Sequence, residues 1–575
     1  NTWGKKIPVY TNKKKTTDTS EISQLEAIVN YVSLFCQSNN IHRLPGICLP
    51  SIPTDIRTDN LSYDSENETG YSVPFGLYDD PEMQRQGIVS VDISRDNIYV
   101  VGSAQMGKTV FLQTVAYGLI RKYSPEQINI YMVDCGSMVL KIFEESNHVG
   151  GVVLSSEDEK CKNLFKLLNT IVIERKKVLS GKGVGNFASY LEAGYADMPQ
   201  IVVMIDNYAA FKEYFPEQND MINSLTREAQ GVGISFVVTT AGSNAMNYRA
   251  QANFGRKLAL NCNDDGEYSN LFGHCKMTPC ENAGRGLQVI EKRILEFQVA
   301  MFGKSNKEAE RSQELKDYIA MRNSQSSSKA MPIPMVPERL VLDEIMQEKA
   351  ALFRTKAILP VGMEFNTVEY NMVDLKSNGS LALLGDAEGR MQFMHNILKM
   401  LSRNIVFHNV EAIIVDDRQK SLAEEGRYGF VRTYTNDAAE GLAYLTDYYD
   451  MLLEREDSED MDSMSTALLV INNTDMLKQI YTDRNMSKEL ASAIKRANET
   501  NAYIILGQID NSPVGFNSSE VLKTLKEERN GVLFASIADN KFYEISGRVK
   551  ADSNFDKSMG YRFGDGVYTK IKLFE

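Results

Sequence analysis

Residues 96–119, DNIYVVGSAQMGKTVFLQTVAYGL, place a glycine-rich loop between two apolar segments. The apolar run at residues 98–101 predicts a buried strand, and the apolar residues at 110–119 predict the buried face of a helix. The loop between them, GSAQMGKT, fits the pattern G-x-x-x-x-G-K-[ST]. In that pattern, backbone N–H groups of the loop and the following helix N-terminus surround phosphate oxygens. Because a strand precedes the loop and a helix follows it, we interpret it as a phosphate-binding loop rather than an ordinary glycine turn.

The loop predicts a set of nucleotide-binding residues. Lys108 is expected to reach the β- and γ-phosphates, and the Thr109 hydroxyl is expected to ligate Mg²⁺. These expectations make ATP and Mg²⁺ the predicted cofactors. The predicted nucleotide-binding residues of the loop are Gly102, Ser103, Ala104, Gln105, Met106, Gly107, Lys108, Thr109 and Val110. Thr240, at the end of the apolar run 234–240, completes the predicted set.

A second apolar run, residues 201–205, ends at Asp206. A carboxylate at the end of such a strand is expected to hold the Mg²⁺ hydration shell from across the site. The alternative is a carboxylate that only caps the next helix. Asn207 follows, at the position where hydrolysis commonly uses a Glu, and an amide can orient water but cannot accept its proton. The sequence therefore favours nucleotide binding over turnover, with Asp206 and Asn207 as the candidate catalytic pair.

Short apolar strands alternate with longer helical patterns along the chain, as in residues 161–179 and 234–240. This alternation predicts βαβ units and parallel sheets covered by helices on both faces. The expected fold is therefore α/β, with parallel-rich sheets flanked by helices.

The same landmarks occur twice in the same order. The glycine of VPFG, Gly76, lies 26 residues before Gly102, and the glycine of LPVG, Gly362, lies 23 residues before Gly385. Further pairs of similar phrases follow, so we interpret the chain as a domain-scale duplication. The expected divisions are the end of an upstream domain or a linker at 1–20, a first domain at 21–302, a linker at 303–330 and a second domain at 331–575.

The second copy lacks the residues that the chemistry needs. Its loop, GDAEGRM at residues 385–391, has Arg390 in place of the lysine and Met391 in place of the hydroxyl. Asn472 and Asn473 stand at the end of the strand that corresponds to the one ending at Asp206. A site without the lysine, the hydroxyl and the carboxylate is a poor site for Mg-nucleotide. We therefore expect a binding or regulatory role for the second domain.

Composition excludes several classes of protein. A chain of 575 residues is too long for one domain, and 63 Lys and Arg against 76 Asp and Glu give a net charge of -13, which disfavours non-specific nucleic-acid binding. The run Lys13, Lys14 and Lys15 is expected to be a solvated tail.

Seven irregularly spaced cysteines favour reduced thiols. No apolar stretch approaches the length of a membrane span.

The motifs together resemble the FtsK/SpoIIIE-type ring ATPases, and within them the EssC/EccC-type motors of type VII (ESX) secretion. The resemblance spans most of the chain, although the second copy is similar mainly in its framework. It is carried by VPFGLYDDPEMQRQ at 73–86, NHVGGVV at 147–153, REAQGVGISFVVTTAGS at 227–243 and GRGLQ at 284–288.

The resemblance implies two tandem RecA-like P-loop domains, the second and third of such a motor, on the cytoplasmic side of the cell membrane and anchored through upstream segments. It implies export of WXG100-type proteins and related effectors, contact with other subunits of the secretion complex and self-association as a hexamer, with no nucleic-acid partner. It also implies Thr239 or Thr240 as a sensor and Arg256 as an arginine finger acting across subunits, with Arg227 and Arg249 as nearby alternatives.

Two alternatives remain open at this point. A DNA translocase shares the motor fold, but it predicts a basic channel and a DNA-reading winged-helix tail, whereas this chain is acidic and ends in GDGVYTKIKLFE. A scaffold in which nucleotide only stabilises an interface between domains would bind ATP without turnover. The favoured hypothesis is a secretion motor whose second domain holds an amphipathic helix of exported protein in an apolar groove.

Overall fold

The computed structural model describes most of the chain. The described residues are 4, 22–42, 49–63, 70–348, 358–375, 379–403, 410–456, 464–497, 499–545, 555–564 and 566–575. Lys13, Lys14 and Lys15, and nearly all of the proposed upstream segment 1–20, lie outside them.

The first unit is built on a ten-stranded sheet with the order β2-β1-β10-β9-β8-β3-β7-β6-β4-β5. The six strands from β8 to β5 run parallel to one another, and the remaining four pair antiparallel. The strands are β1 Ser72–Asp80, β2 Arg85–Asp92, β3 Ile98–Val101, β4 Ile128–Asp134, β5 Val149–Leu154, β6 Gln200–Asp206, β7 Ile234–Thr240, β8 Arg256–Leu260, β9 Arg285–Ile290 and β10 Arg293–Val299.

The central strands β3, β4, β6 and β7 are buried along their whole lengths. A parallel strand covered on both faces needs a continuous apolar run, and that is the pattern the sequence shows here. The helices of the N-terminal part and of the first unit are α1 Gln24–Ser38, α2 Lys108–Lys122, α3 Asp158–Lys182, α4 Phe187–Glu192, α5 Tyr208–Tyr214, α6 Pro216–Glu228, α7 Tyr248–Gln251, α8 Gly266–Phe272 and α9 Glu308–Asn323.

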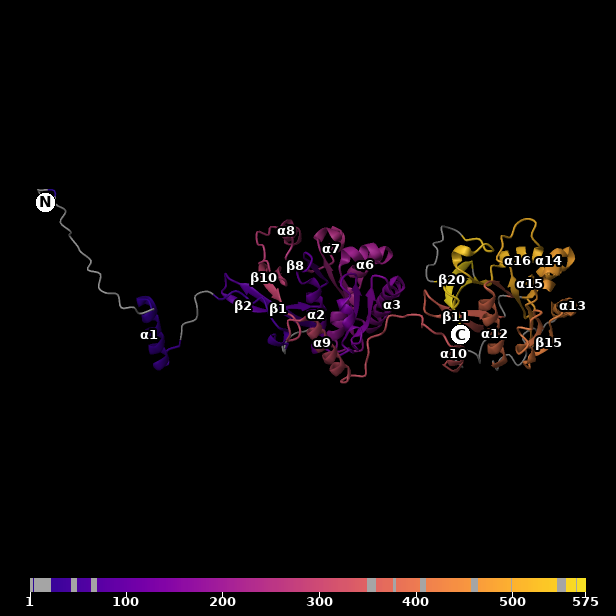
Figure 1. The fold of residues 1–575 in the computed structure, drawn as a ribbon, viewed down its shortest axis with the longest axis horizontal. Coiled ribbons are helices and arrows are strands. Elements are labelled where there is room, and N and C mark those ends of the chain that lie inside the picture. The colour runs from indigo at the N-terminus through magenta and orange to yellow at the C-terminus, as the bar shows by residue number, and fades with distance from the viewer. Residues whose placement is uncertain are drawn as a thin grey trace.

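The second unit repeats this arrangement, with the sheet order β12-β11-β20-β19-β18-β13-β17-β16-β14-β15 (Figure 1). Replacing each strand by its counterpart turns one order into the other, as a duplication predicts. The strands are β11 Ile358–Glu364, β12 Tyr370–Asp374, β13 Ser380–Gly385, β14 Val410–Val415, β15 Val431–Thr435, β16 Thr466–Ile471, β17 Ala502–Ile509, β18 Gly531–Phe534, β19 Met559–Gly564 and β20 Val567–Lys572. The predicted fold of two parallel-rich α/β sheets is confirmed.

Two apolar clusters cover the two faces of the second sheet. Leu468 and Val470 of β16 belong to the cluster with α12, whereas Leu469 and Ile471 belong to the cluster with α13, α14, α15 and α16. Neighbouring residues of a strand point to opposite faces, so α12 lies on one face and the other four helices on the opposite face. The helices are α10 Leu342–Glu348, α12 Ala387–Arg403, α13 Ala438–Glu456, α14 Thr474–Thr482, α15 Arg484–Ala497 and α16 Glu520–Glu528.

The proposed linker 303–330 contains α9, which packs on the first unit through Leu315 and Ile319. After α9, the chain follows the edge strand β5, where Ala330 N–H donates to Asn147 O and Ile333 N–H to Gly150 O. In the part of the chain that the structure describes, no helix combines the length and apolar character that crossing a membrane requires.

Candidate nucleotide site

The glycine-rich loop lies at the carboxyl edge of the parallel strands, where ligands commonly bind in open α/β sheets. It follows β3, whose neighbours β7 and β8 hold it in place. Gly102 N–H donates to Thr240 O at 3.1 Å, and Ser103 N–H donates to Asn261 O at 2.8 Å. The loop is therefore fixed to the sheet at its first two residues, while Ala104 and Gln105 at its tip are exposed.

Gly107 needs to be glycine for two reasons. Its φ is 95°, a conformation that residues with a Cβ rarely adopt. A Cβ at this position would lie 3.0 Å from the backbone N of Gly284, and that N–H donates to Met106 O. The loop therefore closes against Gly284 with no room for a side chain, and α2 begins at the next residue.

The Lys108 side chain folds over the loop. Its Nζ donates to Gly102 O and to Ser103 O, both at 2.7 Å. Burial lowers the pKa of Lys108 from its ordinary value. The ammonium group thus lies inside the curve of the loop, at the place that the phosphate-binding interpretation predicts.

Asp206 joins the loop to two neighbouring strands. Its Oδ2 accepts a hydrogen bond from the Thr109 hydroxyl at 2.8 Å, and its Oδ1 accepts one from the Thr239 hydroxyl at 2.5 Å. Burial raises the pKa of the Asp206 carboxyl, although both hydroxyl donors act in the opposite direction. The two residues predicted as metal ligands, Thr109 and Asp206, are therefore in direct contact.

Asn207 has a structural role that the sequence alone did not show. Its φ of 63° lies in the left-handed region, where Asn is enriched among residues with a side chain. Its side chain caps α5 by accepting from Ala210 N–H at 3.5 Å, and its own N–H donates to the Thr239 hydroxyl at 3.0 Å. This backbone conformation favours Asn over the Glu that proton abstraction would require.

The two adjacent threonines of β7 differ in their contacts. Thr239 touches both Asp206 and Asn207 through its hydroxyl, whereas the Thr240 hydroxyl donates to Gly242 O at 3.3 Å. Thr240 reaches the loop only through its carbonyl, which accepts from Gly102. Of the pair, Thr239 is the better placed to sense what the carboxylate binds.

Arg256 lies away from these residues within the chain. It begins β8 and pairs with Ile98 at the start of β3, at the opposite edge of the sheet from the loop. Its guanidinium lies 4.0 Å from Asp96 Oδ2 and donates to Gln288 Oε1 at 3.5 Å. The structure therefore does not bring Arg256 to the site of its own chain, and the finger role stays a prediction about contact between subunits.

A cavity in the first unit is also remote from the loop. It encloses about 630 Å³ and is lined by Arg95, Phe187 and Arg227, near the edge where β3 and β7 begin. Arg227, one alternative for the finger, thus lines this cavity, whereas Arg249, the other, lies in the short helix α7. Arg227 therefore lies away from the phosphate-binding loop.

The residues present fit a Mg-nucleotide. The donor set combines loop N–H groups at a helix N-terminus, a lysine ammonium, a threonine hydroxyl and a buried carboxylate. Residues outside the motif also support the loop: Ser103 Oγ accepts from Asn263 N–H at 2.8 Å, and Asn261 donates to Cys280 O. No signal in the sequence marked Asn261 and Asn263, because they reach the loop only when β8 pairs with β3.

In the second unit, an arginine replaces the lysine, uncharged side chains replace the hydroxyl and the carboxylate, and these groups contact one another or nearby groups. Arg390 donates to Gly507 O at 2.9 Å and to Gln508 Oε1 at 3.2 Å. Asn472 Nδ2 lies 3.5 Å from Met391 Sδ, and its Oδ1 accepts from Gln508 at 2.9 Å. Met391 and Asn472 are thus in contact at the positions of Thr109 and Asp206, without a hydroxyl or a carboxylate. Gln508 corresponds to Thr240 in strand register, and Gly507, which corresponds to Thr239, has no side chain.

The buried carboxylate nearest to this network already has its full set of partners. Asp416 accepts from Asn472 Nδ2 at 3.1 Å, from Leu422 N–H at 2.7 Å and from the Tyr434 hydroxyl at 2.9 Å. Asp417 N–H also donates to it at 2.8 Å. A carboxylate held by four donors is satisfied within the fold, so it does not replace the missing metal ligand.

The pKa shift of Asp206 predicts how Mg-ATP binding responds to pH. Mg²⁺ binds the carboxylate form, and the raised pKa means that this form is lost at a higher pH than for an ordinary aspartate. As the pH is lowered, affinity for Mg-ATP should therefore begin to fall at a higher pH than an ordinary aspartate would give. Titration calorimetry measures ATP affinity against pH with Mg²⁺ and, separately, with EDTA. The same pH dependence in both conditions would contradict the prediction.

Known proteins resemble this chain in sequence and in fold. Residues 67–252 match the FtsK/SpoIIIE family. The type VII secretion system protein EssC of Staphylococcus aureus (strain MRSA252) is 22% identical over 568 residues, which cover 96% of this chain and 37% of that protein. The ESX secretion system protein EccC of Geobacillus thermodenitrificans is 22% identical over 98% of this chain and 38% of its own length. The chain thus spans less than two fifths of these curated relatives.

Two solved structures share the fold. EssC (ATPases 2 and 3) from Geobacillus thermodenitrificans has a TM-score of 0.75 at 21% identity, covering 92% of this chain and 100% of its own. Thermomonospora curvata EccC (ATPases 2 and 3), solved in complex with a signal sequence peptide, has a TM-score of 0.66 at 19% identity, covering 92% and 96%. This chain therefore contains an FtsK/SpoIIIE-family P-loop domain, and over nearly its whole length it is homologous to the tandem ATPases 2 and 3 of EssC and EccC.

Proposed function

We propose that this chain is the ATP-binding coupling part of a type VII protein secretion motor, in which the first unit binds Mg-ATP and the second recognises exported proteins. One observation carries the proposal: two units with the same strand order differ in their loops. Lys108, Thr109 and Asp206 meet in the first unit, whereas Arg390, Met391 and Asn472 meet in the second. A duplicated framework that has replaced its phosphate and metal ligands in one copy supports a division of labour.

In the first unit, each group would have a distinct role. The loop N–H groups and Lys108 would hold the phosphates, while Thr109 and Asp206 would hold Mg²⁺, which when bound neutralises phosphate charge. Thr239 would keep the Asp206 carboxylate oriented and report its state to Asn207. Because Asn207 can orient water but not accept its proton, turnover by this chain should be slow, and Arg256 would contribute only across an assembled ring.

The proposed setting follows from the relatives. We infer that the chain works on the cytoplasmic side of the cell membrane, within a longer protein that contacts other secretion subunits and assembles as a hexamer. The exported partners would be WXG100-type proteins and related effectors. One relative was solved with a signal sequence peptide, which supports a peptide as the recognised element.

A cavity of about 310 Å³ in the second unit offers apolar contacts for such a peptide. Its walls include Phe393 of α12 and the C-terminal residues Leu573 and Phe574, and Gln392 and Lys557 also line it. Apolar anchors of an amphipathic helix fit a groove of this kind.

Filling this cavity should block the peptide. We expect Gln392→Trp to weaken binding of a fluorescent signal peptide about 10-fold or more, because the indole would occupy the cavity without removing a core side chain. Gln479 is an exposed residue of α14, at the other face of the sheet. Gln479→Trp is therefore the matched control, and this variant should bind the peptide normally. Fluorescence anisotropy measures both, and equal affinities of the two variants would contradict this location.

A further inference from the structure

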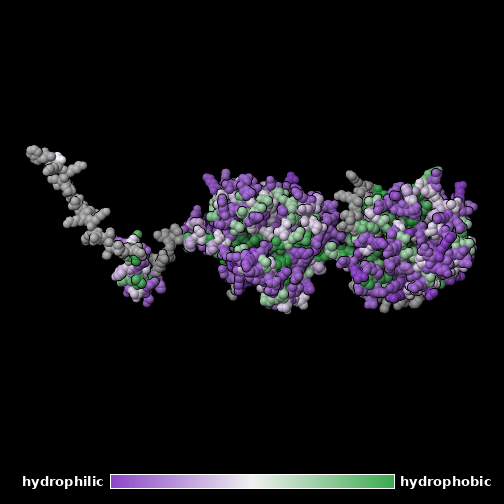
Figure 2. Space-filling view, viewed as in Figure 1, coloured by the Kyte–Doolittle hydropathy of each residue, from purple (hydrophilic) through white to green (hydrophobic). Residues whose placement is uncertain are grey.

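Helix α1 exposes an apolar surface that nothing in the described part of the chain covers. None of its residues is buried, and its single charged residue is Glu26. Figure 2 shows hydrophobic residues on the surface of this helix. An exposed surface of this kind usually marks an interface. The residues that are more than half exposed are Leu25, Ile28, Val29, Tyr31, Val32, Leu34 and Phe35.

The duplication identifies α9 as the counterpart of α1. The two helices have 15 and 16 residues. From the end of α1 at Ser38 to the start of β1 at Ser72 is 34 residues, and from the end of α9 at Asn323 to the start of β11 at Ile358 is 35. Each helix therefore stands at the same distance before the first strand of a ten-stranded sheet.

Helix α9 packs on the unit that precedes it. Leu315 and Ile319 are 1% and 2% exposed and belong to the core of the first unit. Between them, Tyr318 contacts Tyr117 of α2, with ring centroids 5.0 Å apart. The apolar face of α9 thus covers α2, the helix that follows the phosphate-binding loop.

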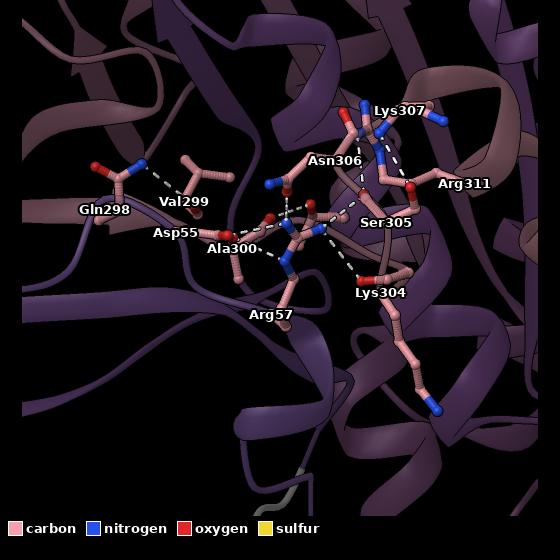
Figure 3. A network of polar contacts seen from close by, with 12 residues as sticks. Asp55, Arg57, Gln298, Val299, Ala300, Lys304, Ser305, Asn306, Lys307 and Arg311 are labelled. Atoms are coloured by element: carbon pink, nitrogen blue, oxygen red, sulfur yellow. Dashed lines mark hydrogen bonds and ion pairs between the residues drawn. The ribbon is translucent and has the colours of Figure 1, made fainter.

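Polar contacts hold both ends of α9 to the same unit. At its end, Arg322 donates to Ile120 O at 3.0 Å and to Tyr123 O at 2.9 Å, which satisfies carbonyls at the C-terminus of α2. Just before its start, Arg57 donates to Gly303 O at 3.3 Å and to Ser305 O at 3.0 Å (Figure 3). Helix α9 is therefore a part of the first unit that leads into the second.

Aligning the first residues of the two helices places Tyr31, Leu34 and Phe35 at the positions of Leu315, Tyr318 and Ile319. These three α1 side chains are 70%, 65% and 51% exposed. We propose that α1 packs through them on a further α/β unit that precedes residue 22 in the same protein, over the helix that follows that unit's loop. The inference goes beyond the proposed function and does not depend on nucleotide binding.

A protein surface fits α1 better than a membrane does. Helices that lie in a membrane interface commonly carry Lys and Arg on their polar face, and residues 24–38 contain neither. The curated relatives are also more than twice as long as this chain, which leaves room for a preceding unit.

The test compares α1 in this 575-residue chain and in the natural full-length protein by hydrogen–deuterium exchange. We expect amides of residues 24–38 to exchange at least about 100-fold more slowly in the full-length protein, because packing suppresses local opening. The double substitution Leu34→Asp and Phe35→Asp should remove this protection. Ser33→Asp should keep it, since the α9 counterpart of Ser33 is the exposed Asp317.

Several outcomes would overturn the proposal. Equal exchange rates in the two proteins would show that no preceding unit covers α1, as would a natural protein without a P-loop unit before residue 22. Protection that disappears on dilution would assign the face to a second copy. Protection that appears only with vesicles of anionic lipid would assign it to a membrane. Because α1 packs on nothing described in this chain, the substitutions should leave the thermal melting of both units unchanged.

Discussion

Lys108→Ala is expected to lower the affinity of the chain for Mg-ATP by about 100-fold or more. The ammonium group lies inside the loop at 2.7 Å from two of its carbonyls, so it is the cation that the β- and γ-phosphates would meet. Loss of one charge-assisted hydrogen bond costs about 1.5–3 kcal/mol, and the substitution would remove the contacts to both phosphates. Titration calorimetry on the full chain measures the change, and a melting curve confirms that the variant is folded.

The duplication supplies the matched control. Arg390 occupies the same position of the second loop but donates to Gly507 O and Gln508 Oε1. Arg390→Ala should therefore leave ATP affinity within about 2-fold of the unsubstituted chain. An equal loss in both variants, or no loss in Lys108→Ala, would show that the division of labour between the units is wrong. Steady-state hydrolysis measured in the same samples should be slow in the unsubstituted chain.

Asp206→Asn should remove most of the benefit that Mg²⁺ gives to ATP binding. The amide keeps the shape of the side chain but has no charge for the metal, and it cannot accept hydrogen bonds from both Thr109 and Thr239 through two oxygens. We expect the ratio of ATP affinities with and without Mg²⁺ to fall about 10-fold or more. Competition binding with a fluorescent nucleotide, with and without EDTA, gives this ratio.

Thr109→Ser is the control for the metal site. Serine keeps the hydroxyl that donates to Asp206 and would ligate Mg²⁺, so the ratio should stay close to that of the unsubstituted chain. An unchanged ratio in Asp206→Asn would mean that another group holds the metal and would remove Asp206 from the proposed site.

Much of the site was predictable because its signals are local. The strand, loop and helix around Gly102 and Lys108 are consecutive in sequence. The apolar run before Asp206 predicts the strand that ends there. Parallel strands bring such ends to one edge of the sheet, so the meeting of Thr109 with Asp206 follows from the pattern. Arg390 and Met391, which replace the ligands in the second copy, are predictable in the same way, because the duplication aligns their loop with the first one.

Other features depend on strand pairing between distant segments. The register of β8 against β3 places Arg256 at the edge opposite the loop and brings Asn261 to Ser103. The sequence places Thr240 among the nucleotide-binding residues and leaves the sensor open between Thr239 and Thr240, but the contact with the carboxylate belongs to Thr239. The positive φ of Asn207 explains why Asn rather than Glu stands at this position, and the residue type alone did not show this.

The sequence by itself determined the fold class, the duplication and which copy keeps the residues of the phosphate-binding motif, because these depend on apolar periodicity and on residues within one short loop. Only the tertiary structure decided which side chains meet, for example that α9 covers α2 while α1 covers nothing in the described chain. The physical reason is that an apolar helix face indicates burial but not its partner. The partner is set by contacts between segments far apart in the sequence, and these exist only in the folded chain.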